Sequence, residues 1–367
     1  MRYLAAALLT FTPIIATATP SIQAIWGGEN QLALKTTQGS YITGSSFNHS
    51  LGQANGYHSL TKFHTDIIDF DCSFSTCLFV DKNLQLWGSG YNGSGQVGVR
   101  ASRSENVKQW TPSINDVVKV SAGSFFSLAL KKNGELWGVG SNVSGNLGGR
   151  SLGRGHNWTL INTNVKDMAA SDEFTLILKN NGSVWGAGKN DKGQLASPPN
   201  KDNPPVWIQS LAGVKQIAAG KKFSLALKYD GSLWSVGHGT HGQLGIHLVN
   251  ERQVSKWQRV LHGVRKIAAG KAHTLALRED GSLWVAGSNR YGQLSLIGQE
   301  KTTFRWVKSR DNVKDIAAQR NGSVLLDNNG VLWGSGDNRE GQLGLGEKSY
   351  IRWWEQIPFQ GSAISKQ

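Results

Sequence analysis

The chain has 367 residues, of which 45 are glycine, 2 are cysteine and 39% are hydrophobic. This composition supports a large folded core and excludes an intrinsically disordered chain. The formal net charge of +14 at pH 7 favours acidic partners, a class that includes acidic proteins, nucleic acid and anionic envelope surfaces.

Residues 1–18 have the features of a secretory signal peptide. Arg2 supplies a positive charge, an apolar stretch follows it, and an Ala-Thr-Ala sequence ending at Ala18 forms a small-x-small cleavage site. The apolar stretch is short and contains a proline, so it does not predict a transmembrane helix, and no later run is long enough to span a membrane. A second cleavage site follows Ala24, but that residue belongs to a predicted strand. We therefore expect cleavage after Ala18 and a soluble, exported mature protein, either periplasmic or secreted.

One stretch, residues 267–294, defines the pattern of the whole chain. Leu275 and Leu277, and then Leu283 and Val285, alternate with polar or small residues, which predicts strands buried on one face. The Asp-Gly pair between these two runs predicts a tight hairpin, because such a turn needs a positive φ that Gly adopts freely.

The Trp that follows this hairpin recurs at intervals of 48 to 50 residues, at Trp87, Trp137, Trp185, Trp234, Trp284 and Trp333. An Asn-Gly or Asp-Gly pair precedes it in most copies, whereas the first two copies carry Gln38-Gly39 and Asn83-Leu84. A repeat of this period is typical of propellers and solenoids. Seven copies follow, near 24–53, 67–98, 117–148, 165–195, 214–245, 264–294 and 313–344.

A second Trp recurs seven residues before the opening Val of the later copies, at Trp110, Trp158, Trp207, Trp257 and Trp306. Leu60 takes that place before the second copy, and a segment with Trp354, at 353–358, is left over after the last copy. We predict that this C-terminal strand completes the first unit and closes the ring, which removes free sheet edges. The predicted fold is all-β, a seven-bladed β-propeller of four-stranded blades that forms a single domain over residues 19–367. An open β-solenoid is the alternative, but it needs capping units.

The recurring Trp rings are predicted to pack between neighbouring blades, where a large ring fills the gap. The Gly-x-Asn-x-x-Gly-Gln-Leu-Gly segments are predicted to form turns, with Gln243, Gln293 and Gln342 as buried amides that bind the loop backbone. Two Gly-x-Gly-x-x-Gly strings, at 88–93 and 237–242, do not open a predicted helix. Phosphate binding is therefore not expected at either string.

The repeat Val-Lys-x-Ile-Ala-Ala-Gly-x-x-His-Thr-Leu-Ala-Leu, continued by Asp-Gly-x-Leu-Trp and Gly-Gln-Leu-Gly, resembles the repeat of the regulator of chromosome condensation family. The resemblance covers essentially the whole mature chain and implies a seven-bladed propeller. The family's His is kept as His273, whereas the other copies carry Asn30, Thr76, Phe126, Phe174, Phe223 and Gly322. Ser171 and Gln319 replace the Gly that follows the Ala-Ala pair.

The resemblance implies two kinds of partner. The founding members of the family are guanine-nucleotide exchange factors for a small GTPase, and this activity would require delivery of the exported chain into a host cell. Secreted β-lactamase-inhibitory propellers share both the repeat and export, which implies inhibition of a secreted or periplasmic enzyme. Fold alone does not transmit either function.

Few residues in the sequence suggest chemistry. His238, His241 and His247 lie close together, but no Asp, Glu or Cys at ligand spacing accompanies them, so we interpret them as exposed loop residues and expect no metal and no cofactor. No Ser-His-Asp, Cys-His or paired-carboxylate arrangement stands out, and we expect a protein that is not an enzyme.

The two cysteines, Cys72 and Cys77, flank a predicted hairpin turn. An exported protein meets oxidising conditions, so a disulfide across this turn is one hypothesis. Two small buried thiols are the other. A bond across so short a loop would stabilise the fold only modestly, because it removes little loop-closure entropy.

Six variable windows between the predicted copies, at 99–109, 149–157, 196–206, 246–256, 295–305 and 345–353, are rich in basic residues. They hold twelve basic side chains against five acidic ones, the basic set being Arg100, Arg103, Lys108, Arg150, Arg154, Lys201, Arg252, Lys256, Lys301, Arg305, Lys348 and Arg352. In a closed propeller the windows are expected on the same face as the Ala-Gly-x-x-His turns, where they would form one basic ring. Nearby aromatic anchors are Tyr91, Tyr291 and Tyr350. An ordinary solvated surface is the alternative.

These observations favour non-catalytic protein binding through a basic loop face, with an acidic surface on the partner. Enzyme inhibition and nucleotide exchange are the two alternatives that the resemblance adds. Nucleic acid suits the charge, but chromatin is out of reach for an exported protein. We expect the protein to be a monomer.

Overall fold

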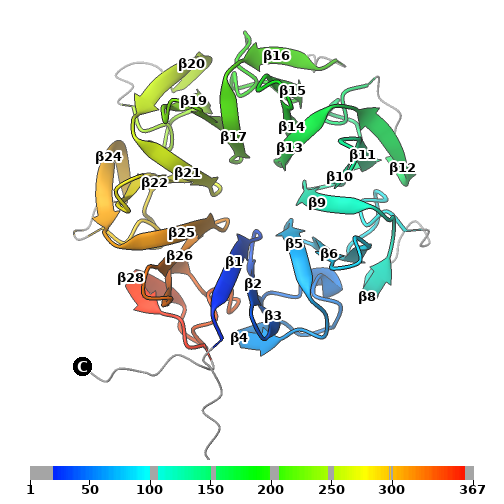
Figure 1. Ribbon diagram of the computed structural model, residues 1–367, viewed down its shortest axis with the longest axis horizontal. Helices are drawn as coiled ribbons and strands as arrows, with labels where there is room; N and C mark the ends of the chain where they lie inside the picture. The colour runs from blue at the N-terminus through cyan, green and yellow to red at the C-terminus, as the bar shows by residue number, and fades with distance from the viewer. Residues whose placement is uncertain are drawn as a thin grey trace, which may run out of the picture.

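The computed structural model describes residues 20–99, 106–149, 154–198, 206–246, 252–296, 298 and 301–359. Within these ranges the chain forms 28 strands and one short 3-10 helix, η1 (Phe47–His49). The strands make seven four-stranded antiparallel sheets, arranged as blades around a central axis (Figure 1). The prediction of an all-β, seven-bladed propeller is confirmed. The predicted signal peptide lies outside the described residues.

Each blade uses its strands in chain order, from strand A at the axis to strand D at the circumference (Figure 1). Blades 1 to 3 consist of β1 (Ile22–Gly27), β2 (Gln31–Thr36), β3 (Gly39–Gly44) and β4 (Tyr57–Lys62); β5 (Ile67–Cys72), β6 (Thr76–Asp81), β7 (Leu86–Gly90) and β8 (Val107–Pro112); and β9 (Val117–Ala122), β10 (Phe126–Lys131), β11 (Leu136–Ser141) and β12 (Arg154–Asn162).

Blades 4 to 7 repeat this arrangement. They consist of β13 (Val165–Ala170), β14 (Phe174–Lys179), β15 (Val184–Gly188) and β16 (Ile208–Leu211); β17 (Val214–Ala219), β18 (Phe223–Lys228), β19 (Leu233–His238) and β20 (Gln253–Leu261); β21 (Val264–Ala269), β22 (His273–Arg278), β23 (Leu283–Ser288) and β24 (Thr302–Arg310); and β25 (Val313–Ala318), β26 (Gly322–Asp327), β27 (Leu332–Asp337) and β28 (Tyr350–Gln356).

The predicted hairpins join strands B and C. Gly281 has φ +78°, and Asp280 Oδ1 accepts the backbone N–H of Ser282 at 2.9 Å. The second blade forms the same turn without Gly. Leu84 adopts φ +62° there, and Asp81 Oδ1 accepts the backbone N–H groups of the residues on both sides of Leu84. A carboxylate that binds the turn backbone thus compensates for a residue that disfavours this conformation.

The hydrophobic core lies between adjacent blades. Leu225 and Leu227 of blade 5 pack with Ala276 of blade 6, and Trp284 and Trp306 cover the edge of the same cluster. This arrangement confirms that the recurring Trp rings fill the gaps between blades. The predicted amides are also confirmed as buried loop ties, since the side-chain oxygens of Gln243, Gln293 and Gln342 accept backbone N–H groups at 2.9 to 3.0 Å.

One glycine shows how neighbouring blades are fitted together. Gly245 of blade 5 has φ +70°, and a Cβ at this position would lie 2.1 Å from the indole nitrogen of Trp306 on the outer strand of blade 6. The Gly that ends the Gly-Gln-Leu-Gly segment is therefore needed for both its backbone conformation and the close approach of the next blade.

The predicted mechanism of ring closure is wrong. The C-terminal strand β28, with Trp354, pairs with β27 inside blade 7, and β4, with Leu60, is the outer strand of blade 1. The strand that carries the second recurring Trp is therefore the last of the four strands of its unit. The prediction had placed it before the first strand of the following unit. As a result every strand in the described part of the chain belongs to a blade, and the four strands of each blade are consecutive in the sequence.

The seam between blades 1 and 7 is closed by packing and hydrogen bonds (Figure 1). Thr43 Oγ1 donates a hydrogen bond to the carbonyl oxygen of Gly341 at 2.9 Å, and His58 accepts one from the N–H of Gly346. Register also corrects the first copy: Gln31 pairs with Gly44 as His273 pairs with Gly287. Gln31, and not Asn30, therefore occupies the position of the family's His.

Candidate functional site

One face of the ring carries all the turns between strands A and B and the loops between strands C and D. We call it the loop face. The end of strand C bonds to the A–B turn of its own blade, as in Ser141 N to Phe125 O at 2.8 Å and His238 N to Lys222 O at 2.9 Å. The basic windows follow these ends of strand C, and part of each of the first five windows lies outside the described residues. They join two strands of one blade, however, and do not join neighbouring blades as predicted.

A central cavity of about 360 Å³ opens along the axis between the seven A strands. The third residue of each A strand belongs to a ring around the axis, made of Ala24, Asp69, Lys119, Asp167, Gln216, Lys266 and Asp315, of which Asp69, Lys119, Gln216 and Lys266 line the cavity. Opposite charges in this ring are paired: Lys119 Nζ lies 2.6 Å from Asp167 Oδ1, and Lys266 pairs with Asp315. These contacts join neighbouring blades and place polar groups along the channel.

Two carboxyl groups of β5 are buried against blade 3. Asp69 accepts the N–H of Val120 at 2.8 Å, and Asp71 accepts the N–H of Ala122 at 2.9 Å and the hydroxyl of Ser121 at 3.0 Å. Burial raises the pKa of Asp69 to about 7 and that of Asp71 to about 6. Both groups are therefore partly protonated near neutral pH.

The channel mouth on the loop face is surrounded by the equivalent residue of each A–B turn, namely Glu29, Phe74, Ser124, Asp172, Lys221, Lys271 and Arg320. Backbone hydrogen bonds join several of these turns in succession: Lys221 N to Lys271 O at 3.3 Å, Lys271 N to Arg320 O at 2.9 Å, Arg320 N to Glu29 O at 3.0 Å and Glu29 N to Cys72 O at 2.9 Å. The backbone thus holds the turns of blades 5, 6, 7, 1 and 2 in fixed positions.

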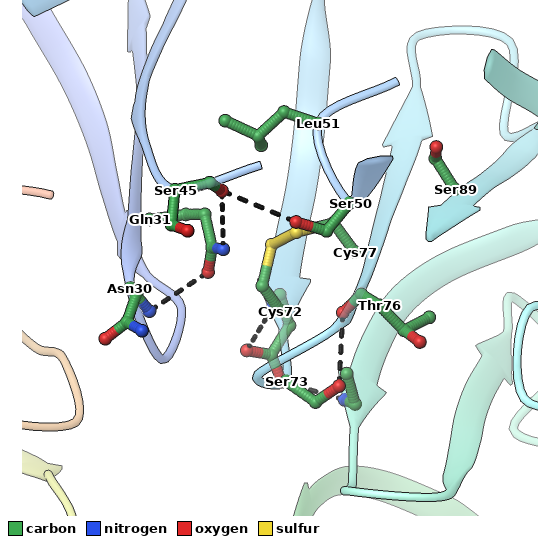
Figure 2. The surroundings of a disulfide bond; sticks show 12 residues. Asn30, Gln31, Ser45, Ser50, Leu51, Cys72, Ser73, Thr76, Cys77 and Ser89 are labelled. Atoms are coloured by element: carbon green, nitrogen blue, oxygen red, sulfur yellow. Dashed lines mark hydrogen bonds between the residues drawn. A yellow bond between two sulfur atoms is a disulfide. The ribbon is translucent and has the colours of Figure 1, made fainter. Parts of the chain in front are cut away.

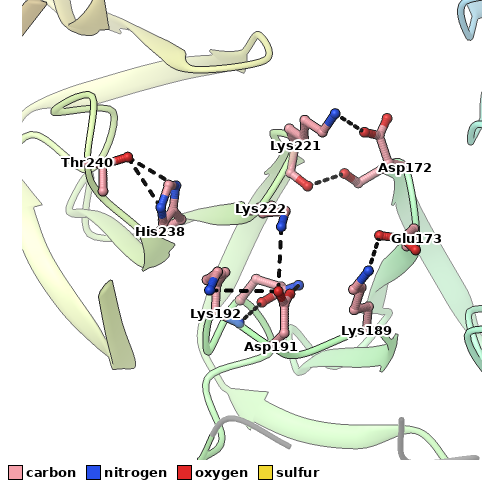
Figure 3. A network of polar contacts seen from close by, with 11 residues as sticks. Asp172, Glu173, Lys189, Asp191, Lys192, Lys221, Lys222, His238 and Thr240 are labelled. Carbon is pink, nitrogen blue, oxygen red and sulfur yellow. Dashed lines mark hydrogen bonds and ion pairs between the residues drawn. The ribbon is translucent and has the colours of Figure 1, made fainter. Parts of the chain in front are cut away.

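Basic residues dominate the mouth over blades 5 to 7. We define Lys221, Lys222, Lys271 and Arg320 as the cationic sector. Carboxylates at its edges form ion pairs, namely Arg320–Glu29 at 3.1 Å, Lys221–Asp172 at 3.1 Å and Lys222–Asp191 at 3.5 Å. Figure 3 shows the last two pairs beside the pair of Lys189 with Glu173. Burial raises the pKa of Glu29, although Arg320 opposes that shift.

Exposed apolar side chains gather on the same face over blades 1 to 3. Phe47 of η1 and Phe125 of an A–B turn are 50% and 52% exposed, and Phe74 and Val143 are exposed as well. The rings of Phe47 and Phe74 are 4.7 Å apart. We define these four residues as the apolar sector. Large exposed apolar groups that cluster on one face are typical of protein interfaces.

The two sectors meet at one contact. The guanidinium carbon of Arg320 lies 5.5 Å from the centre of the Phe74 ring. Sequence reasoning missed both sectors, because each A–B turn contributes only one or two variable residues. The signal was present in Phe74, which occupies a turn position where the other copies carry polar or charged residues, and in Phe125, whose position is polar or charged in every other copy except for Ala272.

The disulfide between Cys72 and Cys77 supports the turn that carries Phe74 (Figure 2). The two residues face each other across the paired strands β5 and β6. The carbonyl oxygen of Cys72 also accepts the N–H of Glu29 from blade 1. In this structure the cysteines are therefore bonded, and the turn that carries Phe74 is tied to blade 1 through the carbonyl oxygen of Cys72.

The predicted basic binding residues lie away from the mouth. Lys108, Lys256, Arg305 and Arg352 are exposed on the outer strands of blades 2, 5, 6 and 7, and Arg252 and Lys301 are exposed just before outer strands. Arg154 is the first residue of β12, whereas Arg100, Arg103, Arg150 and Lys201 lie outside the described residues. The described members are spread around the circumference, and their role in binding stays a prediction.

The predicted tyrosine anchors differ in surroundings. Tyr291 stacks on Tyr350 with ring centres 5.7 Å apart, and the guanidinium of Arg339 lies against both rings while it pairs with Asp337. Tyr91 is half-buried at the start of the loop that follows β7.

Other candidate chemistry finds little support. His238 and His241 have ring centres 6.4 Å apart, with Thr240 between them, and no metal-binding group of three or more His, Cys, Asp or Glu occurs in the described part of the chain. Figure 3 shows Thr240 beside the ring of His238. Burial lowers the pKa of His238. Among the described residues, no helix is long and apolar enough to cross a membrane. Both Gly-rich strings begin in strand C and open no helix.

Comparisons with solved structures support the fold. Human WBSCR16 is 20% identical, with a TM-score of 0.77 and coverage of 87% of this chain and 93% of that one. Yeast RCC1 (Prp20), solved bound to Kap60, is 19% identical, with a TM-score of 0.78 and coverage of 98% and 91%. No curated protein sequence matches the chain significantly. The family profile described as RCC1-like domain matches residues 117–364. The chain therefore belongs to the RCC1-like domain family.

Proposed function

We propose that the protein is an exported, non-catalytic propeller whose loop face binds another protein. The observation that carries this proposal is the direct contact of the apolar and cationic sectors around one mouth, at Arg320 and Phe74. Interface hot spots combine desolvated aromatic anchors with Arg, and the rigid backbone of the A–B turns lowers the entropic cost of binding. Export is supported by the signal features of residues 1–18 and suits a disulfide-bonded chain.

Binding without catalysis is also supported by a buried Ser-His contact between two blades. His273 Nε2 lies 3.1 Å from Ser323 Oγ, and both side chains are fully buried. Ser323 donates its hydroxyl hydrogen to the carbonyl oxygen of Gln293 at 2.7 Å, so the ring nitrogen is the donor to Ser323. Burial lowers the pKa of His273 to about 4. This pair stabilises the contact between blades 6 and 7 and cannot reach a substrate.

The charge of the chain favours an acidic protein partner. Exposed basic residues on the outer strands, such as Lys108, Lys256 and Arg305, would attract such a surface over a distance and accelerate encounter. Glu29, Asp172 and Glu173 at the mouth oppose a polyanionic backbone, which disfavours nucleic acid. We propose a monomer with no cofactor as the binding unit.

A secreted enzyme is the second candidate for the partner, and the protein would then act as its inhibitor by covering its active site. The disulfide favours an oxidising compartment and hence this candidate over exchange activity on a cytosolic GTPase. Yeast RCC1 shares only the fold at 19% identity, so the exchange alternative rests on fold alone.

The experiment is site-specific photo-crosslinking in the organism that makes the protein. A photoreactive phenylalanine analogue is placed at Phe125 on the loop face or at Tyr229 on the opposite face, where the side chain is 59% exposed. We expect a protein adduct from position 125 that is absent from position 229, with mass spectrometry to identify it. Adducts from position 229 alone, or equal adducts from both positions, would refute the proposal.

A further inference from the structure

Lys271 has a special place in the channel mouth. It lies in the A–B turn of blade 6, between the equivalent residues Lys221 of blade 5 and Arg320 of blade 7. The backbone N–H of Lys271 donates to Arg320 O, and its carbonyl oxygen accepts from Lys221 N. The fold therefore holds three cationic side chains next to one another around one opening.

The flanking cations each pair with a carboxylate, whereas Lys271 has no ion pair in the described part of the chain. Arg320 pairs with Glu29, and Lys221 pairs with Asp172, both at 3.1 Å. Within the described part of the chain, no carboxylate lies within 4.0 Å of the Lys271 ammonium. Burial lowers the pKa of Lys271, and the charges of Arg320 and Lys221 lower it further, whereas Glu29 and Asp172 oppose the shift from outside ion-pair distance.

The buried carboxyl groups of the channel do not serve as counterions for Lys271. Asp69 and Asp71 belong to β5, which lies across the channel from β21 (Figure 1). Both accept hydrogen bonds from blade 3, and burial raises the pKa of each. An incoming anion would therefore meet, at a preformed opening, a cation that has no direct ion pair among the described residues.

We infer that the mouth binds a carboxylate of the protein partner, with Lys271 as its anchor and the residue next to that carboxylate packed on Phe74. The inference rests on the proposed function and specifies its chemistry. A cavity of about 360 Å³ is large enough for one acidic side chain with its hydration water. The contact between Arg320 and Phe74 places an apolar surface directly beside the cations.

The acidic residues at the edge of the mouth favour one carboxylate over a chain of phosphates. Glu29 and Asp172 lie beside the outer two cations, and Glu173 lies next to Asp172. A single carboxylate at Lys271 is repelled less by these groups than a polyphosphate, which carries more negative charge and extends across them.

The test uses two acetylated tetrapeptide amides, Gly-Glu-Phe-Gly and its matched control Gly-Gln-Phe-Gly, together with inorganic phosphate. Lysines are labelled by reductive ¹³C-methylation, which keeps their charge, and binding is followed by NMR on the Lys271 resonance. We expect the Glu peptide to shift this resonance and the Gln peptide to bind at least about ten-fold more weakly, since a charged hydrogen bond is lost.

Two variants make the test specific. Lys271→Gln keeps the backbone hydrogen bonds and should weaken Glu-peptide binding about ten-fold, measured by calorimetry. Lys132→Gln removes the same charge from an exposed B–C turn on the opposite face and should leave binding unchanged. Thermal unfolding checks that both variants are folded.

Three results would overturn the inference: equal binding of the Glu and Gln peptides, unchanged binding by Lys271→Gln, or a shift by phosphate at lower concentrations than by the Glu peptide. Crosslinking from position 125 is independent of these measurements. If that adduct forms while the peptide tests fail, the loop face binds protein without a carboxylate anchor, and only the inference is refuted.

Discussion

Replacement of Asp69 by Asn should change how the stability of the propeller depends on pH. Burial raises the pKa of Asp69 from 3.8 to about 7, so the folded state holds the proton more tightly than the unfolded state. Stability from this group is present below pH 3.8 and is lost as the pH rises through about 7. In Asp69→Asn the amide oxygen still accepts the N–H of Val120, and the titration is gone.

The magnitude follows from the shift. The pKa of Asp69 is 3.8 in the unfolded chain and about 7 in the folded chain. The stabilisation that this group gives to the folded state therefore falls by about 3 kcal/mol between pH 4.5 and 7.5. The variant should therefore gain about 3 kcal/mol relative to the wild type over this interval.

Urea unfolding at several pH values in this interval measures the gain. Asp311→Asn is the matched control, because Asp311 is 68% exposed and its pair with Lys308 is a surface ion pair of small energy. If the difference in unfolding free energy between Asp69→Asn and wild type is the same at pH 4.5 and 7.5, the assignment of a buried, proton-retaining carboxyl group is refuted.

Three further predictions concern the fold and the N-terminus. Gly245→Ala should destabilise the protein by about 2–4 kcal/mol, because it combines a positive φ with a clash against the next blade, whereas Gly149→Ala should be neutral in the same urea assay. The disulfide predicts that intact mass rises by two hydrogens on reduction, and that replacing Cys72 and Cys77 by Ser costs about 2 kcal/mol; an unchanged mass would exclude the bond. N-terminal sequencing of the exported protein should begin at Thr19, and retention of the initiating Met in the mature protein would refute the signal peptide.

The repeat was sufficient to predict the blades. The alternation of apolar and polar residues, the hairpin pairs and the Trp spacing each indicate a strand or turn within one copy. The strands from β3 to β27 form where these patterns predict them, and this holds even in the copy where Leu84 replaces the Gly of the turn. The limits of each unit could not be predicted in the same way. A cyclic repeat has no intrinsic start, so a strand with Trp354 or Leu60 can be assigned to the copy before or after it, and only strand pairing decides.

The candidate site was less predictable than the fold. Phe74, Lys271 and Arg320 are single variable residues in turns about 50 to 250 positions apart in the chain. Their proximity comes from closure of the ring, and the ion pairs that distinguish Lys271 from its neighbours depend on side-chain positions. Sequence reasoning therefore emphasised the basic windows, where charge is dense along the chain, and missed charges that the fold brings together.

The central claim is that the loop face around the channel mouth binds the partner. The most direct measurement is the dissociation constant, by surface plasmon resonance, of the crosslinked partner once it is purified. The double variant Phe74→Ala, Phe125→Ala should bind at least about ten-fold more weakly than wild type, because aromatic anchors dominate interface energies. Tyr229→Ala on the opposite face should bind as wild type does. Unchanged binding by the double variant, together with weaker binding by Tyr229→Ala, would contradict the account.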